Sequence, residues 1–185
     1  DNILPRYGID VTLVDGTDLD QWKDALKKKT SCIFIETPSN PTLEILDLSM
    51  ICKISHDAGA KVIVDNVFAT PILQKPIQFG ADIVVYSATK HIDGQGRVLG
   101  GAILGTNKFC SEMVSPFIRN TGPSLSPFNA WVLLKGIETL ETRIKEQTSS
   151  AIKIADFIAD FSVIRNLIYP GRKDHPHFSL ARNQM

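Results

Sequence analysis

Cysteine is scarce in this sequence, and the few cysteines are poorly placed for pairing. Cys32, Cys52 and Cys110 are the three cysteines among 185 residues, and no C-x-x-C pair occurs. An odd number of cysteines at such wide spacing argues against a disulfide framework and against a zinc site built from thiolates. We therefore expect a protein that works in a reducing compartment, most simply the cytoplasm.

Net charge and long apolar runs are also missing. The 20 lysines and arginines balance the 20 aspartates and glutamates, so no excess of positive charge attracts nucleic acid or anionic lipid. No apolar stretch is long enough to cross a bilayer, and no basic start precedes an apolar segment as in a secretory signal. We expect neither nucleic acid nor a membrane among its partners, and a cytoplasmic location.

The remaining composition is that of an ordinary globular protein. With 43% hydrophobic residues, the chain can bury one core and begin another domain. It begins at Asp1 rather than at methionine and ends at Met185 without a closing element, so we expect a fragment of a longer protein. We predict a large cofactor-binding domain over residues 1–160, incomplete at its N-terminus, and the start of a smaller C-terminal domain over residues 161–185.

Short apolar runs alternate with segments of helical periodicity. Strands are predicted over residues 11–14, 32–36, 61–64, 83–85 and 102–104, and the segment from 162 to 171 has a strand-like pattern. Helices are predicted to begin at the caps Asp18, Asp47 and Ser126. The last helix is either very long or two helices joined near residues 148–150. This alternation predicts an α/β fold with a mostly parallel sheet flanked by helices.

Chemically capable side chains follow the predicted strands. Asp65 follows one β-branched run, Ser87, Thr89 and Lys90 follow another, and Asn40 lies in a double-proline turn after a third. In parallel sheets, ligands bind beyond the carboxyl ends of the strands. Each residue alone has a duller explanation, since a lysine after a strand is usually solvated and an aspartate there usually caps a turn. Their combination is more informative than any single member.

The combination meets the needs of one cofactor, pyridoxal 5'-phosphate. This cofactor is an electron sink for carbanions, and it requires a lysine for a Schiff base and an acid to pair with its protonated ring nitrogen. Lys90 and Asp65 suit those two roles. Ser87 and Thr89 can hydrogen-bond its phosphate, and Asn40 can donate to its phenolic oxygen.

Three other interpretations of the motifs are weaker. The segment Ser87 to Lys90 fits the S-x-x-K pattern of penicillin-binding enzymes, but their S-D-N and K-T-G partners are absent. The stretch from Gly94 to Gly100 has the spacing G-x-G-x-x-x-G and no strand leading into it, which is a poor nucleotide loop. His175 and His177 flank a proline without a nearby third ligand, so we predict a surface turn there and no metal site.

Four ordered segments carry a family resemblance that spans nearly the whole chain. They are E-T-P-S-N-P (36–41), V-D-N-V-F-A-T-P (64–71), S-A-T-K-H-I-D-G-Q-G-R-V-L-G-G (87–101) and S-P-F-N-A-W (126–131). Together they resemble the Cys/Met-metabolism family of fold-type I pyridoxal phosphate enzymes. The resemblance implies the PLP-transferase fold type I, with Lys90 as the Schiff-base lysine and Asp65 as the pyridinium partner. It also implies that Ser87 and Thr89 bind phosphate and that Asn40 contacts the cofactor.

Finer features of the resemblance favour one activity within the family. The stretch D-G-Q-G-R (93–97) looks most like that of O-succinylhomoserine sulfhydrylases, which make homocysteine and succinate from O-succinylhomoserine and sulfide in methionine biosynthesis. Cystathionine γ-synthase, O-acetylhomoserine sulfhydrylase and methionine or cystathionine γ-lyase stay open as alternatives. So does an inactive truncated scaffold or assembly subunit. Many members have threonine where this chain has Val67.

The resemblance also implies parts that lie outside this chain. Similar proteins bind the cofactor phosphate and stack on its ring through residues upstream of Asp1, and they bind the substrate carboxylate through an arginine downstream of Met185. They assemble as tetramers of paired dimers. We therefore expect a full-length homo-oligomer that acts on a small amino-acid ester and sulfide, and we expect this chain alone to be inactive.

Overall fold

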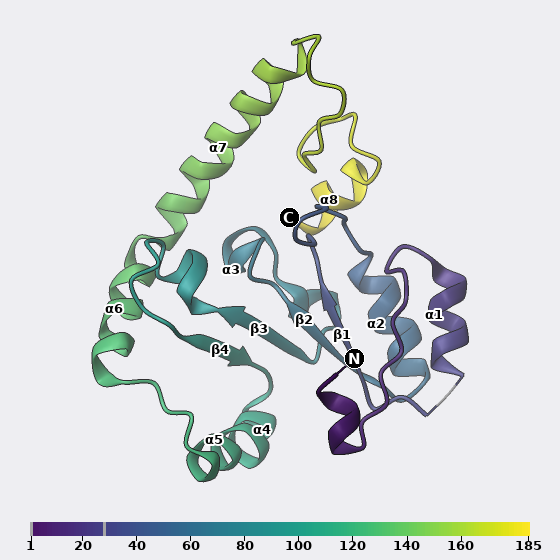
Figure 1. Cartoon of the computed structure of the whole chain (residues 1–185), viewed down its shortest axis with the longest axis vertical. Coiled ribbons are helices and arrows are strands. Elements are labelled where there is room, and N and C mark those ends of the chain that lie inside the picture. Colours follow the sequence, from purple (N-terminus) through teal and green to yellow (C-terminus); the bar gives the residue numbers. More distant parts are fainter. Residues whose placement is uncertain (1, 28) are drawn as a thin grey trace.

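The computed structural model describes residues 2–27 and 29–185, which form a four-stranded sheet with helices packed around it (Figure 1). The strands are β1 (Cys32–Glu36), β2 (Lys61–Asp65), β3 (Ile83–Ser87) and β4 (Gly101–Leu104), side by side in chain order. β1, β2 and β3 run parallel, and β4 runs antiparallel to β3. The predicted α/β fold with a mostly parallel sheet is therefore confirmed.

The helices lie between and after the strands. The α-helices are α1 (Leu19–Leu26), α2 (Leu48–Asp57), α3 (Thr70–Leu73), α4 (Asn107–Phe109), α5 (Ser115–Thr121), α6 (Pro127–Glu138), α7 (Leu140–Ala159) and α8 (Phe178–Gln184). Short 3-10 turns span Leu4–Tyr7 and Pro76–Phe79, and π-helical turns span Ala88–Ile92 and Cys110–Val114.

The three predicted helix caps are confirmed. Asp18 accepts hydrogen bonds from the first-turn amides of α1, Asp47 accepts one of 2.9 Å from the amide of Met50, and Ser126 accepts one of 3.1 Å from the amide of Asn129. Each cap satisfies a backbone N–H that has no partner inside the helix, which is worth about 1 kcal/mol.

The main core lies between the sheet and α2. Its fully buried members are Leu48 and Ile51 of α2, Val62 and Val64 of β2, and Val84 of β3. Burial of each such side chain stabilises the fold by about 1.5–3 kcal/mol. The alternation of buried and outward positions along β2 fixes which of its side chains remain available at its end.

Two strand predictions are wrong. Residues 11–14 form no strand, and Val11 and Leu13 are exposed there. Residues 162–171 are irregular and turn-forming. In both places a β-branched pattern lacks a neighbouring strand, and without one the backbone cannot complete a ladder of hydrogen bonds.

The long C-terminal helix is two helices, but the junction lies earlier than predicted. Thr139 has non-helical angles (φ −112°, ψ 3°) and separates α6 from α7. The break follows Gly136 and Ile137. Glycine and β-branched residues are weaker helix formers than alanine or leucine. α7 continues without interruption through residues 148–150.

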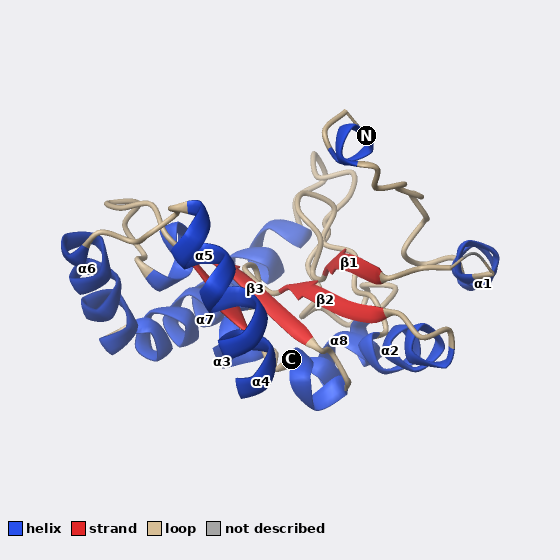
Figure 2. Cartoon of the chain, turned by 90° about the horizontal axis from the view of Figure 1, so that it is seen from below, coloured by secondary structure: helices blue, strands red, loops and turns tan. Residues whose placement is uncertain are grey.

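The last segment of the chain returns to the sheet. α7 runs away from the sheet, and the following irregular stretch brings α8 back beside β1 and α2 (Figure 1). Gln184 of α8 accepts a hydrogen bond of 2.9 Å from the Leu48 N–H. Figure 2 shows α1 and α2 toward the β1 end of the sheet and α6 toward the opposite end. α7 ends at Ala159, next to the predicted boundary at residue 160, which itself stays a prediction.

Candidate active site

The side chains predicted to form the site come from one end of the sheet. In the parallel register, Glu36 of β1 lies beside Asp65 of β2, and Asp65 lies beside Val85 of β3. Asn40 follows β1, Asp65 ends β2, and residues 87–90 end β3 and begin the turn beyond it. The structure therefore places all five at the carboxyl edge, where parallel sheets bind ligands.

Asp65 is half-buried and only partly engaged. Its Oδ1 accepts a hydrogen bond of 3.0 Å from the backbone N–H of Val67. Within the described residues, no other hydrogen bond or ion pair holds this carboxylate, so Oδ2 is able to accept from a ligand. Because the bond to Oδ1 comes from the backbone, valine in place of threonine at position 67 does not remove it.

Lys90 projects from a kinked turn. The π-helical turn Ala88–Ile92 follows β3 directly, and Lys90 has non-helical angles within it (φ −83°, ψ −114°). Its side chain is exposed, and no residue in 2–27 or 29–185 gives its amine a hydrogen bond or an ion pair. A free amine at a strand end is suited to covalent bonding with an aldehyde.

Thr89 and Ser87 lie where the glycine-rich loop closes. The Thr89 hydroxyl accepts a hydrogen bond of 3.1 Å from the N–H of Gly100 and lies 3.5 Å from the carbonyl oxygen of the same residue. Ser87 pairs with Gly101 of the antiparallel β4. The loop therefore returns to the edge that carries Lys90. Phosphate binding by the two hydroxyls stays a prediction.

Asn40 is exposed in the loop after β1. Both X-Pro bonds of that loop, before Pro38 and Pro41, are cis. The Asn40 backbone N–H donates to Glu36 Oε2 at 3.4 Å, and in the described part of the chain the side-chain amide has no partner. Its contact with a cofactor stays a prediction.

Asp93 fixes the far end of the Lys90 turn. Its buried carboxylate accepts hydrogen bonds from the Arg97 backbone N–H (2.6 Å) and from Arg97 Nε (2.8 Å). Burial alone would raise the pKa of Asp93, but these hydrogen bonds and the charge of Arg97 lower it below its usual range. The carboxylate is therefore charged near neutral pH, and it closes the loop 93–97.

Three buried amide side chains, those of Asn66, Gln74 and Gln184, form a hydrogen-bonded relay that supports this edge of the sheet. The sequence pattern did not predict this relay. Gln74 Nε2 donates to Asn66 Oδ1 (2.8 Å) and to the Thr37 carbonyl (2.7 Å), and Gln184 Nε2 lies 3.4 Å from Gln74 Oε1. Asn66 Nδ2 donates to the Tyr86 hydroxyl at 2.9 Å. The relay joins the residue after Asp65, the loop that carries Asn40 and helix α8. In the sequence, these residues stand out only as amides next to apolar runs.

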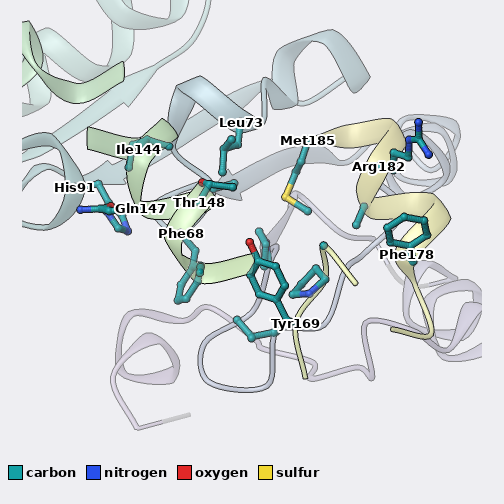
Figure 3. A pocket seen from close by; sticks show the side chains of 17 residues that line it. Phe68, Leu73, His91, Ile144, Gln147, Thr148, Tyr169, Phe178, Arg182 and Met185 are labelled. Carbon is teal, nitrogen blue, oxygen red and sulfur yellow. The ribbon is translucent and has the colours of Figure 1, made fainter. Parts of the chain in front are cut away.

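The apolar cavity next to this edge is not lined by the five predicted residues. It has a volume of about 590 Å³ and lies between α7, α8 and the loops after β1 and β2 (Figure 3). Its wall includes Phe68 and His91, which are sequence neighbours of the site residues, together with Tyr169 and Met185. Burial lowers the pKa of His91, and the positive charge of Arg143 adds to that effect.

His175 and His177 lie in turns before α8, and the His177 N–H donates to His175 Nδ1 at 3.1 Å. Within residues 2–27 and 29–185 there is no cluster of three or more potential metal ligands. In that same part of the chain, no helix combines the length and apolarity needed to span a membrane.

The groups at the edge fit pyridoxal phosphate chemically. A free amine and a half-engaged carboxylate extend from neighbouring strands, and two hydroxyls lie beside the amine with a glycine-rich loop. Lys90 would hold the aldehyde carbon, and Asp65 would pair with the ring nitrogen. The structure brings Ser87, Thr89 and Lys90 together on one short segment and places Asp65 on the adjacent strand.

Comparisons with known proteins agree with this chemistry. O-succinylhomoserine sulfhydrylase of Mycobacterium tuberculosis is 51% identical over 183 residues, which cover 99% of this chain and 45% of that protein. L-methionine gamma-lyase of Treponema denticola is 38% identical over 185 residues, covering 98% of this chain and 46% of that protein. The chain therefore spans less than half the length of these relatives.

Structural similarity is equally extensive. The crystal structure of metB from Corynebacterium glutamicum matches with a TM-score of 0.96 at 35% identity, covering 100% of this chain and 48% of that one. The structural neighbours are fold-type I PLP-dependent enzymes, which confirms the predicted fold class and indicates pyridoxal phosphate as the cofactor. The family model described as Cys/Met metabolism PLP-dependent enzyme matches residues 1–185. This chain accordingly belongs to the Cys/Met metabolism family of PLP-dependent enzymes.

Proposed function

We propose that the full-length protein catalyses a pyridoxal phosphate-dependent γ-replacement, in which O-succinylhomoserine and sulfide give homocysteine and succinate. The observation that carries the proposal is a free amine, Lys90, and a half-engaged carboxylate, Asp65, at the ends of adjacent parallel strands. The 51% identity to an O-succinylhomoserine sulfhydrylase supports this choice of ester and sulfur donor.

The chain's own residues divide the work between them. The cofactor, when bound, supplies an electron sink for negative charge at the substrate's Cα. Asp65 would keep a proton on the ring nitrogen, because a nearby negative charge favours the cationic form. Lys90 would hold the cofactor covalently, and its amine, when free, would remove and return protons at the substrate's carbon atoms. Ser87 and Thr89 would bind the phosphate, and Asn40 would donate to the phenolic oxygen.

The net exchange takes place at the substrate's Cγ. The bond from Cγ to the ester oxygen breaks and succinate leaves as a carboxylate, while a bond forms from Cγ to sulfur. Hydrogen sulfide supplies the sulfur atom and the hydrogen of the product thiol, and its second hydrogen is released as a proton. The Lys90 amine, exposed on its turn, is free to transfer the protons that this exchange requires.

The proposal includes a homo-oligomer with a separate C-terminal domain. The helix α6 has an exposed apolar face, and its members are Phe128, Trp131, Leu134 and Ile137. A contiguous face of this kind is commonly covered by another chain. The end of α7 at Ala159 supports a domain boundary after residue 160.

The decisive experiment offers substrates to the full-length protein loaded with pyridoxal phosphate. O-succinylhomoserine and O-acetylhomoserine are each supplied with sulfide or with cysteine, and methionine is supplied alone. We expect homocysteine from O-succinylhomoserine and sulfide, and loss of this activity in Lys90→Ala. Cystathionine from cysteine would indicate a γ-synthase, and cleavage of methionine without consumption of either ester would refute the sulfhydrylase.

A second measurement tests the cofactor assignment independently of the substrate. The loaded protein is reduced with borohydride, digested, and its labelled peptide is sequenced by mass spectrometry. The proposal requires the label on Lys90. Label on a different lysine, or no label at all in a folded protein, would overturn the assignment of the site.

A further inference from the structure

All three guanidinium nitrogens of Arg143, in α7, donate hydrogen bonds to neutral acceptors around the Lys90 turn. Its Nη1 donates to the carbonyl of His91 at 2.9 Å, and its Nη2 donates to the carbonyls of Ile92 at 3.3 Å and Gly136 at 2.8 Å. Its Nε donates to the Thr139 hydroxyl at 3.1 Å. The first two acceptors are the two residues that immediately follow Lys90.

Two glycines make this arrangement possible. A Cβ on Gly94 would overlap the guanidinium of Arg143, and a Cβ on Gly136 would overlap the carbonyl oxygen of Ile92. Gly94 begins the glycine-rich stretch whose spacing does not fit a nucleotide loop. It leaves room instead for an arginine that lies 49 residues further along the chain.

The turn is held at two places by different means. Arg97 closes its far end through the Asp93 carboxylate, as described above. The carbonyls of His91 and Ile92, nearer to the reactive lysine, receive side-chain hydrogen bonds from Arg143 alone among the described residues. Figure 3 shows His91, on this turn, beside Ile144 and Gln147 of α7, the helix that carries Arg143.

Geometry rather than charge pairing explains the choice of arginine. No carboxylate in residues 2–27 or 29–185 forms an ion pair with Arg143. A planar fork with fixed donors can reach several carbonyls at once, whereas a lysine ammonium is a compact point charge on a flexible stem. The lowered pKa of His91, caused first by burial and then by the charge of Arg143, agrees with this proximity.

We propose that Arg143 is a positioning residue for Lys90, holding the turn so that the lysine amine meets the cofactor aldehyde. This inference rests on the proposed function, since it takes Lys90 as the residue that binds pyridoxal phosphate. It links helix α7 to the backbone of the two residues that follow the reactive lysine. Arg143 does not touch the cofactor or the substrate in this role.

The test compares three variants of the full-length protein. Arg143→Met removes the donors and keeps the aliphatic stem, and Arg143→Lys keeps one positive charge. Lys145→Met is the matched control, because Lys145 lies on the same helix and, among the described residues, pairs only with Glu141 at the surface. Hydrogen exchange of residues 88–97 is measured in the apoprotein, and the rate at which Lys90 becomes trappable by borohydride is measured with saturating pyridoxal phosphate.

In Arg143→Met we expect exchange of the Asp93 and Gly94 amides to be about 100-fold faster, because two charge-assisted hydrogen bonds to the turn are lost. Attachment of Lys90 should be about 10- to 100-fold slower. Arg143→Lys should recover part of both effects, and Lys145→Met should match the wild type. Adding Gly94→Ala to Arg143→Met should cost less than their separate effects combined, because the guanidinium that a Cβ would meet is gone.

Three outcomes overturn the proposal or separate it from the proposed function. Unchanged exchange in Arg143→Met would show that the arginine does not hold the turn. Faster exchange with an unchanged attachment rate would reduce Arg143 to a purely structural residue and refute the positioning role. Failure of the wild-type protein to form any trappable bond at Lys90 would instead refute the proposed function.

Discussion

Replacement of Gln74 by leucine is the sharpest test of how the site edge is supported. Gln74 is fully buried, and leucine has a similar size without the amide. The change removes the donors to the Thr37 carbonyl and to Asn66 Oδ1, at 2.7 and 2.8 Å. Both acceptors belong to fully buried residues, Thr37 and Asn66. Water therefore cannot replace the lost donors unless the structure opens.

The expected loss follows from those two unsatisfied acceptors. Each buried acceptor left without a donor lowers the free energy of unfolding by about 1–3 kcal/mol. The greater apolar surface that leucine buries offsets part of this loss. We expect the free energy of unfolding to fall by about 2–4 kcal/mol. At a denaturant dependence of about 2 kcal/mol per molar urea, the urea midpoint should fall by about 1–2 M.

The assay follows unfolding of the full-length apoprotein in urea by circular dichroism at one protein concentration. Gln78→Leu is the matched control, because Gln78 lies four residues away and is exposed, and it should shift the free energy by no more than about 0.5 kcal/mol. If Gln74→Leu had the same midpoint as Gln78→Leu and the same slope, the amide relay would contribute nothing to stability and the reasoning would be wrong.

Three other predictions use different residues. Asp65→Asn should lower kcat for O-succinylhomoserine by about 100-fold while changing the Kd for pyridoxal phosphate much less, because the neutral amide no longer favours the protonated ring nitrogen; equal losses in both would contradict this role. Burial raises the pKa of the Cys52 thiol to about 11 and shields its sulfur from solvent, so iodoacetamide at pH 8 should alkylate it about 100-fold more slowly than the exposed Cys32; equal rates at the two cysteines would contradict this. Trp131→Asp, which places a charge on the exposed apolar face of α6, should lower the mass of the full-length oligomer in light scattering; an unchanged mass would exclude this face as an interface.

The parts of the fold that could be predicted are those set by neighbouring residues. Asp47 and Ser126 were recognisable as caps because a cap acts on amides two or three positions away. The runs 61–64 and 83–85 are recognisable as buried strands because their β-branched side chains point to both faces of the sheet, and the structure extends them to residues 65 and 87. The polar residues after those strands were then placed at one edge by the parallel register alone.

The failed predictions concern segments whose local pattern is ambiguous. Residues 11–14 and 162–171 carry β-branched side chains, but a strand exists only when another strand lies beside it, and sequence periodicity does not show that neighbour. The helix junction was misplaced because Ser149 and Ser150 look like a break, whereas hydroxyls on a helix surface are tolerated. The actual break at Thr139 lies just before Arg143, which packs against a turn formed about 50 residues earlier.

The most informative contacts at the site were invisible to sequence reading for the same reason. Arg143 binds the carbonyls of residues 91 and 92, and Gln184 approaches Gln74 across 110 positions of sequence. Residue type predicts that Lys90 and Asp65 are reactive, because their chemistry belongs to the side chain itself. It does not predict which arginine or amide holds their backbone in place, because that depends on tertiary packing. If both supports act as proposed, the geometry of the reactive amine depends on α7, and that of the carboxylate depends on α8. Cofactor binding should then be sensitive to the C-terminal part of the chain even though every predicted cofactor contact lies before residue 91.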